Sequence, residues 1–300
     1  MAIILKNDDI TLRIEKAGEC YRGSRFDWNG TVTSFAFRGI ELLGEEKPRF
    51  QRNPALFGRG LHNEFGIKRC IGYDDCKIGE WFPKIGTGWL KKDEKPYFFY
   101  TQYELEPLKF ASLANGDTEA VFSCESGERN GYAYRYTKRI TLDKTGFTIK
   151  YELENTGSKQ LETEEYVHNF LCVGGKRMDR GYSLSFPWTL EPAQFVETNN
   201  PDGILFVNGK RVEVIGTTRK QFYLGGLSEG VTKKKGLAAA WTLEHEGKGV
   251  RLSETGNFEP SGVHLWGWKS VISPEVFHSF RIMPGFKGSW ERNYAVSAIQ

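Results

Sequence analysis

The chain has 300 residues, of which 39% are hydrophobic and 14% aromatic, so it can bury a large core. Its 41 basic and 38 acidic residues nearly balance, and no basic stripe with interleaved aromatic residues is found, which argues against a nucleic-acid partner. No apolar run approaches the length of a membrane-spanning helix, and the apolar stretch at the N-terminus is too short for a signal peptide.

Alternation of apolar and polar residues with a period of two dominates the chain, which is typical of β-strands with one buried face. In 147–155, FTIKYELEN, the apolar residues alternate with threonine, lysine and glutamate. Similar runs predict strands, in chain order, at 9–15, 31–37, 119–124, 133–142, 147–155, 182–186, 204–215, 236–245, 249–254, 278–283 and 289–296. Turn signals such as Asn-Gly separate these runs, and VNGKRV (207–212) predicts a hairpin.

Helical periodicity is nearly absent, and 53–65 is expected to hold one short turn of helix at most. We find no internal repeat, linker or break in composition, so residues 1–300 are predicted to form one domain. The expected fold class is all-β, an antiparallel structure whose sheet edges are protected by packing two sheets together. The one sharp basic run, 233–235, is expected to be a solvated turn.

Five cysteines, scattered and without a CxxC pair, predict neither a disulfide framework nor a zinc site. Free buried thiols in a reducing compartment are the simplest interpretation, so a cytoplasmic location is expected. The glycine-rich segments lack the spacing of a dinucleotide or phosphate loop, and no HxH motif is present. No metal or organic cofactor is therefore predicted.

Two histidines are the strongest candidates for chemistry. His62 lies in a glycine-punctuated segment, predicted as a loop, together with Arg59 and Glu64. Loops with several polar groups are common places for binding sites. His168 follows a predicted strand and enters an aromatic stretch. Its position alone fits either a packed core residue at a strand end or a group placed to move a proton.

Glu275 stands out among the carboxylates because Val276 and Phe277 follow it directly. A carboxylate among apolar groups tends to have a raised pKa, which suits proton transfer. The alternative is an ordinary glutamate at a sheet edge. Trp266 and Trp268 share one face of a strand just upstream, where they either pack in the core or offer flat apolar surfaces to a ligand.

Three segments occur in this order along the chain: GLHNEFGI, FTIKYELENTGSKQLETEEYVHNF and VISPEVFHSFRIMPGFKGSWERNY. They resemble, respectively, the first histidine segment, the strand–turn–strand leading to the second histidine, and the C-terminal glutamate block of the galactose mutarotase-like (aldose 1-epimerase) superfamily. The resemblance spans most of the chain. It implies an antiparallel β-supersandwich with the sugar cleft on a concave sheet face.

The resemblance also implies roles for individual residues. His168 would be the general acid and Glu275 the general base of an aldose 1-epimerase, which interconverts the α and β anomers of an aldose by ring opening. The residues expected to bind the substrate, a monosaccharide or sugar phosphate, are His62, Arg59, Glu64, Trp266 and Trp268. Two alternatives stay open: a non-catalytic carbohydrate-binding protein of the same fold, and a polysaccharide-active, lyase-related enzyme.

Overall fold

The computed structural model describes residues 1–229 and 236–299, so the basic run 233–235 lies outside the described residues. Nearly all of its regular structure is antiparallel β-sheet, as predicted. Four 3₁₀ turns complete it: η1 (Arg49–Gln51), η2 (Val173–Gly175), η3 (Pro192–Gln194) and η4 (Glu246–Lys248). No helix in the described part of the chain is long and apolar enough to cross a membrane. All five cysteines are free thiols.

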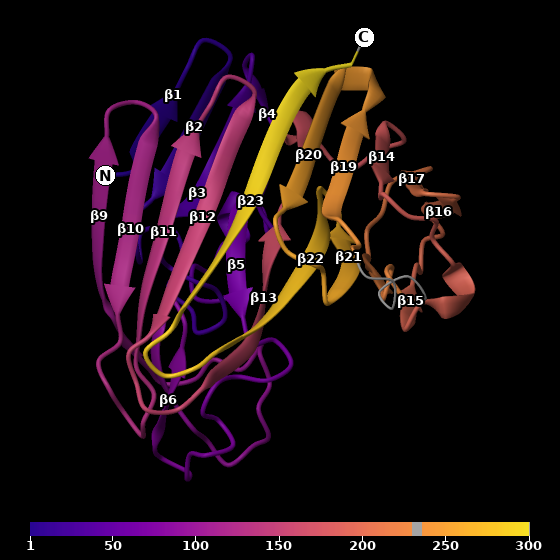
Figure 1. The fold of residues 1–300 in the computed structure, drawn as a ribbon. Helices are drawn as coiled ribbons and strands as arrows, with labels where there is room; N and C mark the ends of the chain where they lie inside the picture. The colour runs from indigo at the N-terminus through magenta and orange to yellow at the C-terminus, as the bar shows by residue number, and fades with distance from the viewer. Residues whose placement is uncertain (230–235, 300) are drawn as a thin grey trace.

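Two ten-stranded sheets form the body of the described part of the chain, and Figure 1 shows them as two layers. The first sheet contains, in spatial order, β1 (Ile3–Lys6), β2 (Ile10–Glu15), β3 (Thr31–Phe37), β5 (Leu61–Phe65), β13 (Leu161–Asn169), β22 (Val271–Ile282), β21 (Gly262–Trp268), β18 (Gln221–Gly225) and β15 (Glu197–Asn199), with β4 (Ile40–Glu41) beside β3. The second contains β16 (Leu205–Asn208), β17 (Arg211–Val214), β14 (Tyr182–Ser185), β19 (Ala239–His245), β20 (Val250–Gly256), β23 (Lys287–Ala298), β12 (Gly146–Asn155), β11 (Tyr134–Leu142), β10 (Glu119–Glu125) and β9 (Lys109–Asn115). A small third sheet contains β6 (Trp81–Lys84), β7 (Gly88–Lys91) and β8 (Leu105–Pro107).

Several predicted elements match these strands closely. The run 147–155 lies within β12, and the VNGKRV hairpin is formed by β16 and β17, in which Asn208 pairs with Arg211. The prediction for 53–65 was wrong in its last part. Residues 61–65 form β5, a strand inside the first sheet with all five residues buried. A strand buried on both faces shows no alternation of apolar and polar residues, and the glycines that flank it are equally typical of a loop.

The two sheets face each other across a core that contains paired polar groups. On β13, the side chains of Glu165 and Asn169 point toward the second sheet: Glu165 binds Arg292 on β23, and Asn169 accepts a hydrogen bond from Tyr294. Because successive side chains of a strand point to opposite faces, His168 lies on the outer face of the first sheet. Both faces of β13 are therefore buried near its end, and the outer face there borders a cavity.

Candidate functional site

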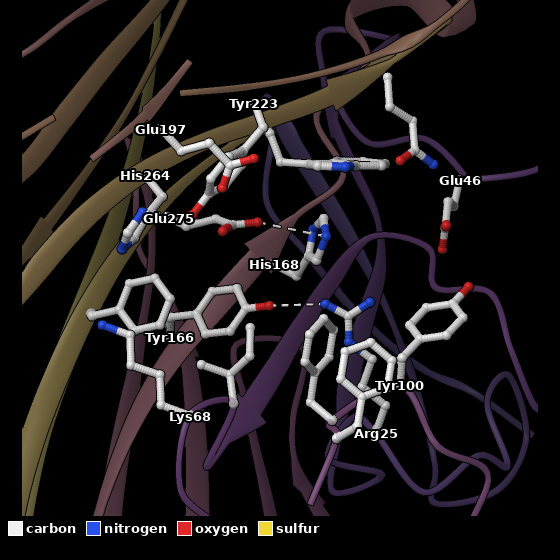
Figure 2. Close-up of a pocket in the computed structure, with 16 residues that line it drawn as sticks. Arg25, Glu46, Lys68, Tyr100, Tyr166, His168, Glu197, Tyr223, His264 and Glu275 are labelled. Carbon is white, nitrogen blue, oxygen red and sulfur yellow. Dashed lines mark hydrogen bonds and ion pairs between the residues drawn. The ribbon is translucent and has the colours of Figure 1, made fainter. Parts of the chain in front are cut away.

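A cavity of about 680 Å³ lies on the outer face of the first sheet. Five adjacent strands, β13, β22, β21, β18 and β15, contribute alternate residues to its floor, as the period of a strand requires. Loops before β3, after β4, after β5 and before β8 close its sides. Figure 2 shows the lining residues: Arg25, Glu46, Ile67, Lys68, Phe98, Phe99, Tyr100, Tyr166, His168, Glu197, Gln221, Tyr223, His264, Trp266, Glu275 and Phe277.

His168 and Glu275 face each other on the neighbouring strands β13 and β22. Nε2 of His168 lies 3.6 Å from Oε1 of Glu275, and both side chains are almost completely buried (Figure 2). The His168 ring stacks on Phe170 at 4.2 Å and meets the edge of Trp266 at 4.9 Å, which fixes its orientation. The arrangement places an imidazole and a carboxyl group side by side at the cavity floor.

Burial gives this pair unusual protonation behaviour. It raises the pKa of Glu275 to about 8, against a smaller lowering effect of the Arg25 charge. The same burial lowers the pKa of His168 well below its usual value, helped by the positive charge of Arg25. At neutral pH the unliganded pair therefore holds one proton, on Glu275, and carries no net charge.

Asn169 and Ser273 hold the two strands together behind the pair. The backbone N–H of Asn169 donates to the Ser273 hydroxyl at 2.9 Å, and that hydroxyl donates to Oε1 of Glu275 at 3.3 Å. The Asn169 amide also donates to the carbonyl of Pro274 at 2.7 Å. The regular ladder of β13 and β22 ends at the pair Glu165–His278, so these side-chain bonds tie the strands together beyond its end.

Arg25 forms the other side of the floor. Its Nε donates to Glu64 at 2.8 Å and its Nη2 to the hydroxyl of Tyr166 at 3.1 Å, while Tyr166 also donates to Glu64. The guanidinium packs over Phe26 and Phe99, 4.5 and 4.6 Å from the ring centroids. Glu64 thus neutralises the buried charge of Arg25, whose guanidinium points into the cavity. Glu64 itself does not line the cavity and contacts a lining residue, Arg25.

The structure brings together only part of the predicted site. His168, Glu275 and Trp266 line the cavity, and Glu64 lies directly behind it. His62 pairs with His168 across the β5–β13 ladder and does not line the cavity. Its ring is stacked on a phenylalanine, and neither ring nitrogen has a hydrogen-bond partner among the described residues. Burial lowers the pKa of His62 to about 3.

Arg59 and Trp268 also lie outside the set of lining residues. Arg59 forms an isolated bridge with Glu45. Trp268 follows Trp266 on the same face of β21, but its indole N–H donates to the carbonyl of Arg219, and Lys47 covers the ring at 3.7 Å. The prediction that these two side chains contact the ligand therefore has no support from their positions.

Thirteen of the sixteen lining residues were not among the predicted site residues, and four of these carry polar groups of the floor and its sides: Arg25, Tyr166, Tyr223 and His264. Arg25 comes from an irregular loop with no motif around it. Tyr166 and Tyr223 follow the alternation of their strands and look like any aromatic strand residue. For His264 the sequence does contain a signal: it lies two residues before Trp266 on β21, and residues two apart on a strand face the same side. The prediction that Trp266 lines the site therefore extends to His264.

No group of three or more His, Cys, Asp or Glu residues that could hold a metal ion occurs in the described ranges. The polar groups of the cavity include an imidazole–carboxyl pair, a balanced guanidinium and hydroxyls, besides the side chains of Glu46, Lys68, Glu197 and Gln221. These groups are suited to moving protons and to binding hydroxyl groups of a ligand.

No protein-family model matches the chain, and no curated protein matches its sequence. Forty-six chains of solved structures do match its fold. A galactose mutarotase-like protein from Lactobacillus casei is 13% identical with a TM-score of 0.58, and the match covers 99% of this chain and 100% of that one. A galactose mutarotase-like protein from Clostridium acetobutylicum is 11% identical with a TM-score of 0.59, covering 99% and 95%.

The GalM/aldose epimerase homologue from C. elegans is 12% identical with a TM-score of 0.53, and the match covers 100% of this chain and 99% of that one. At such low identities the likeness concerns the fold, and its coverage of whole chains includes both large sheets. The chain therefore has the galactose mutarotase-like β-sandwich fold predicted from its sequence segments.

Proposed function

We propose that the protein is an aldose 1-epimerase, which interconverts the α and β anomers of an aldose. The observation that carries the proposal is the buried His168–Glu275 pair, with its two reacting atoms 3.6 Å apart on a cavity floor. The hydroxyl-bearing and aromatic lining supports a sugar ligand, since sugars present both hydroxyl groups and apolar faces. The structural neighbours named as mutarotase-like proteins support it further.

Opening the sugar ring requires removal of the proton on O1 and protonation of the ring oxygen O5. Both oxygens are bonded to C1, so a base and an acid that lie side by side can reach them together. In the proposed reaction the proton that the resting pair carries on Glu275 first passes to His168. Glu275 then accepts the O1 proton and His168 donates to O5. After rotation about C1–C2, the two groups reverse these roles and close the ring on the other face.

The proposed chemistry needs no oxidant, metal or added group, because every proton that leaves the sugar returns to it. After ring opening, Glu275 is protonated and His168 is neutral. This is the state that burial favours in the unliganded cavity, since it lowers the pKa of His168 and raises that of Glu275. The cavity therefore favours the protonation state that accompanies the open-chain sugar.

The pH dependence of kcat/KM tests this proton count. One proton must be present on the pair, so we expect a plateau around neutrality and a roughly tenfold fall per pH unit above about pH 8, where the pair loses that proton. The acid limb should lie well below pH 6.5, where His168 and Glu275 are both protonated. Anomer exchange measured by NMR between pH 5 and 10, after subtraction of the buffer rate, gives the profile. A rate that continues to rise beyond pH 9 would contradict it.

The activity itself is tested with a panel of α-aldoses and their 6-phosphates, followed by NMR from dissolution to anomeric equilibrium. Acceleration over buffer with at least one sugar is the expected result, and the preferred sugar defines the substrate class. Binding of a sugar without acceleration would overturn the epimerase proposal and favour a carbohydrate-binding protein. Release of shorter or unsaturated sugars from a polysaccharide would favour the lyase-related alternative.

A further inference from the structure

His264 is a cavity residue whose chemistry differs from that of His168. It lies on β21 directly opposite Glu275 in the β21–β22 register. Its ring packs parallel to Tyr223 and edge-on to Phe277, with centroids 5.8 and 4.9 Å away. The imidazole is thus held between two aromatic rings at one side of the cavity, and its position is fixed by packing.

The hydrogen bonds of His264 define its tautomer. The backbone N–H of Gly226 donates to Nδ1 at 3.2 Å. A backbone N–H cannot act as an acceptor, so Nδ1 carries no proton, and the Tyr223 hydroxyl, 2.8 Å away, also donates to it. The proton of the neutral ring is therefore on Nε2. No hydrogen bond of Nε2 occurs within the described part of the chain, so this N–H is available to a ligand.

The sheet places His264 and His168 on opposite sides of Glu275. β22 lies between β13 and β21, and Figure 2 shows Glu275 between the two histidines. In the proposed reaction Glu275 lies at O1 and His168 at O5. The remaining heavy-atom neighbour of C1 is C2. An orientation in which C2 points away from His168 along the floor brings it to the side of Glu275 where His264 lies.

From this order we infer that His264 is a specificity-determining residue whose Nε2–H donates a hydrogen bond to the C2 hydroxyl of the aldose. The inference rests on the proposed function for the orientation of the sugar. It assigns the two histidines different tasks: His168 exchanges a proton, whereas His264 keeps its proton because two donors occupy its other nitrogen. Burial also lowers the pKa of His264 to about 4, which keeps the ring neutral at physiological pH.

The first test reads the tautomer without any sugar. Ring ¹⁵N shifts of histidine-labelled protein at pH 7, with the His264 signals assigned by their loss in His264→Gln, should show a protonated Nε2 and an unprotonated Nδ1. The opposite tautomer would overturn the inference. This measurement is independent of catalysis, so it stands whether or not the epimerase proposal holds.

The second test compares an accepted aldose with its 2-deoxy analogue in wild type, His264→Phe and His264→Gln. We expect His264→Phe to lower kcat/KM for the parent sugar about three- to tenfold, mainly through KM, and to leave the 2-deoxy sugar unchanged. His264→Gln keeps a side-chain N–H donor and should lose less. Equal losses on both sugars would overturn the inference. If wild type binds sugars without exchanging anomers, the dissociation constants of the two sugars for the three proteins are measured by calorimetry instead. Weaker binding of the parent sugar alone would support the inference, and equal losses on both sugars would overturn it.

Discussion

Replacement of Glu275 by glutamine is expected to slow anomer exchange about 10²–10⁴-fold, because it removes the proposed base and leaves the shape of the cavity nearly unchanged. The amide cannot accept the O1 proton, whereas it can still accept the hydrogen bond from Ser273. The loss should therefore appear in kcat, with sugar binding largely retained. NMR exchange rates together with a sugar titration of the variant measure both effects.

The same substitution is expected to stabilise the folded protein at high pH. Burial raises the pKa of Glu275 to about 8 from 4.5, so the folded state keeps a proton that the unfolded chain releases. This contribution of Glu275 to stability is complete below about pH 4.5 and is lost as the pH rises toward 8. Glutamine does not titrate, so the advantage of Glu275→Gln should grow across this window to about 5 kcal/mol, since a difference of one in pKa corresponds to about 1.4 kcal/mol.

Urea unfolding of both proteins at pH 5, 7 and 8.5 checks the trend, and Glu162→Gln is the matched control. Glu162 lies on β13 outside the cavity, in an exposed ion pair with Arg281. Its substitution should change neither the exchange rate nor, by more than about 1 kcal/mol, the free energy of unfolding. A Glu275→Gln variant with more than a tenth of the wild-type kcat would refute the role of Glu275.

The parts of this molecule that the sequence predicts are those decided by local patterns. Strand β12 and the β16–β17 hairpin follow from alternation and an Asn-Gly turn over a few residues. Glu275 was singled out by its apolar neighbours, and its pKa is indeed raised by burial. For the role of His168 the decisive support was a family resemblance, because its position alone also fitted a core residue.

The parts that the sequence does not reveal depend on contacts between distant segments. Arg25 enters the cavity because Glu64, 39 residues away, and Tyr166, 141 residues away, bind its guanidinium. The tautomer of His264 depends on a backbone N–H 38 residues earlier, at Gly226. No local sequence pattern indicates either of these contacts. His62 illustrates the reverse error, since its glycine-flanked segment suggested a loop site but forms a buried strand beside the cavity floor, where Phe26 covers the His62 ring.

Behind that floor, Arg292 is the centre of a buried charge network, and its replacement by leucine is expected to destabilise the fold by about 3–5 kcal/mol. Its Nη2 binds Glu165 on β13 at 2.8 Å and its Nη1 binds Glu254 on β20 at 2.5 Å, with all three side chains essentially inaccessible to solvent. Removal of the guanidinium leaves two carboxylates buried without their cation. Urea unfolding at pH 7 measures the loss.

The network should also matter for the site, because Nη2 of Arg292 donates to the carbonyl of Val276, the residue after Glu275. Arg251→Leu is the control: this arginine on β20 pairs with Glu244 at 2.7 Å, but half of its side chain is exposed, so a cost below about 1 kcal/mol is expected. If buried charge is the cause, adding Glu165→Gln and Glu254→Gln to Arg292→Leu should recover part of the lost stability. Equal costs for the two arginines would show that the network contributes no more than a surface ion pair.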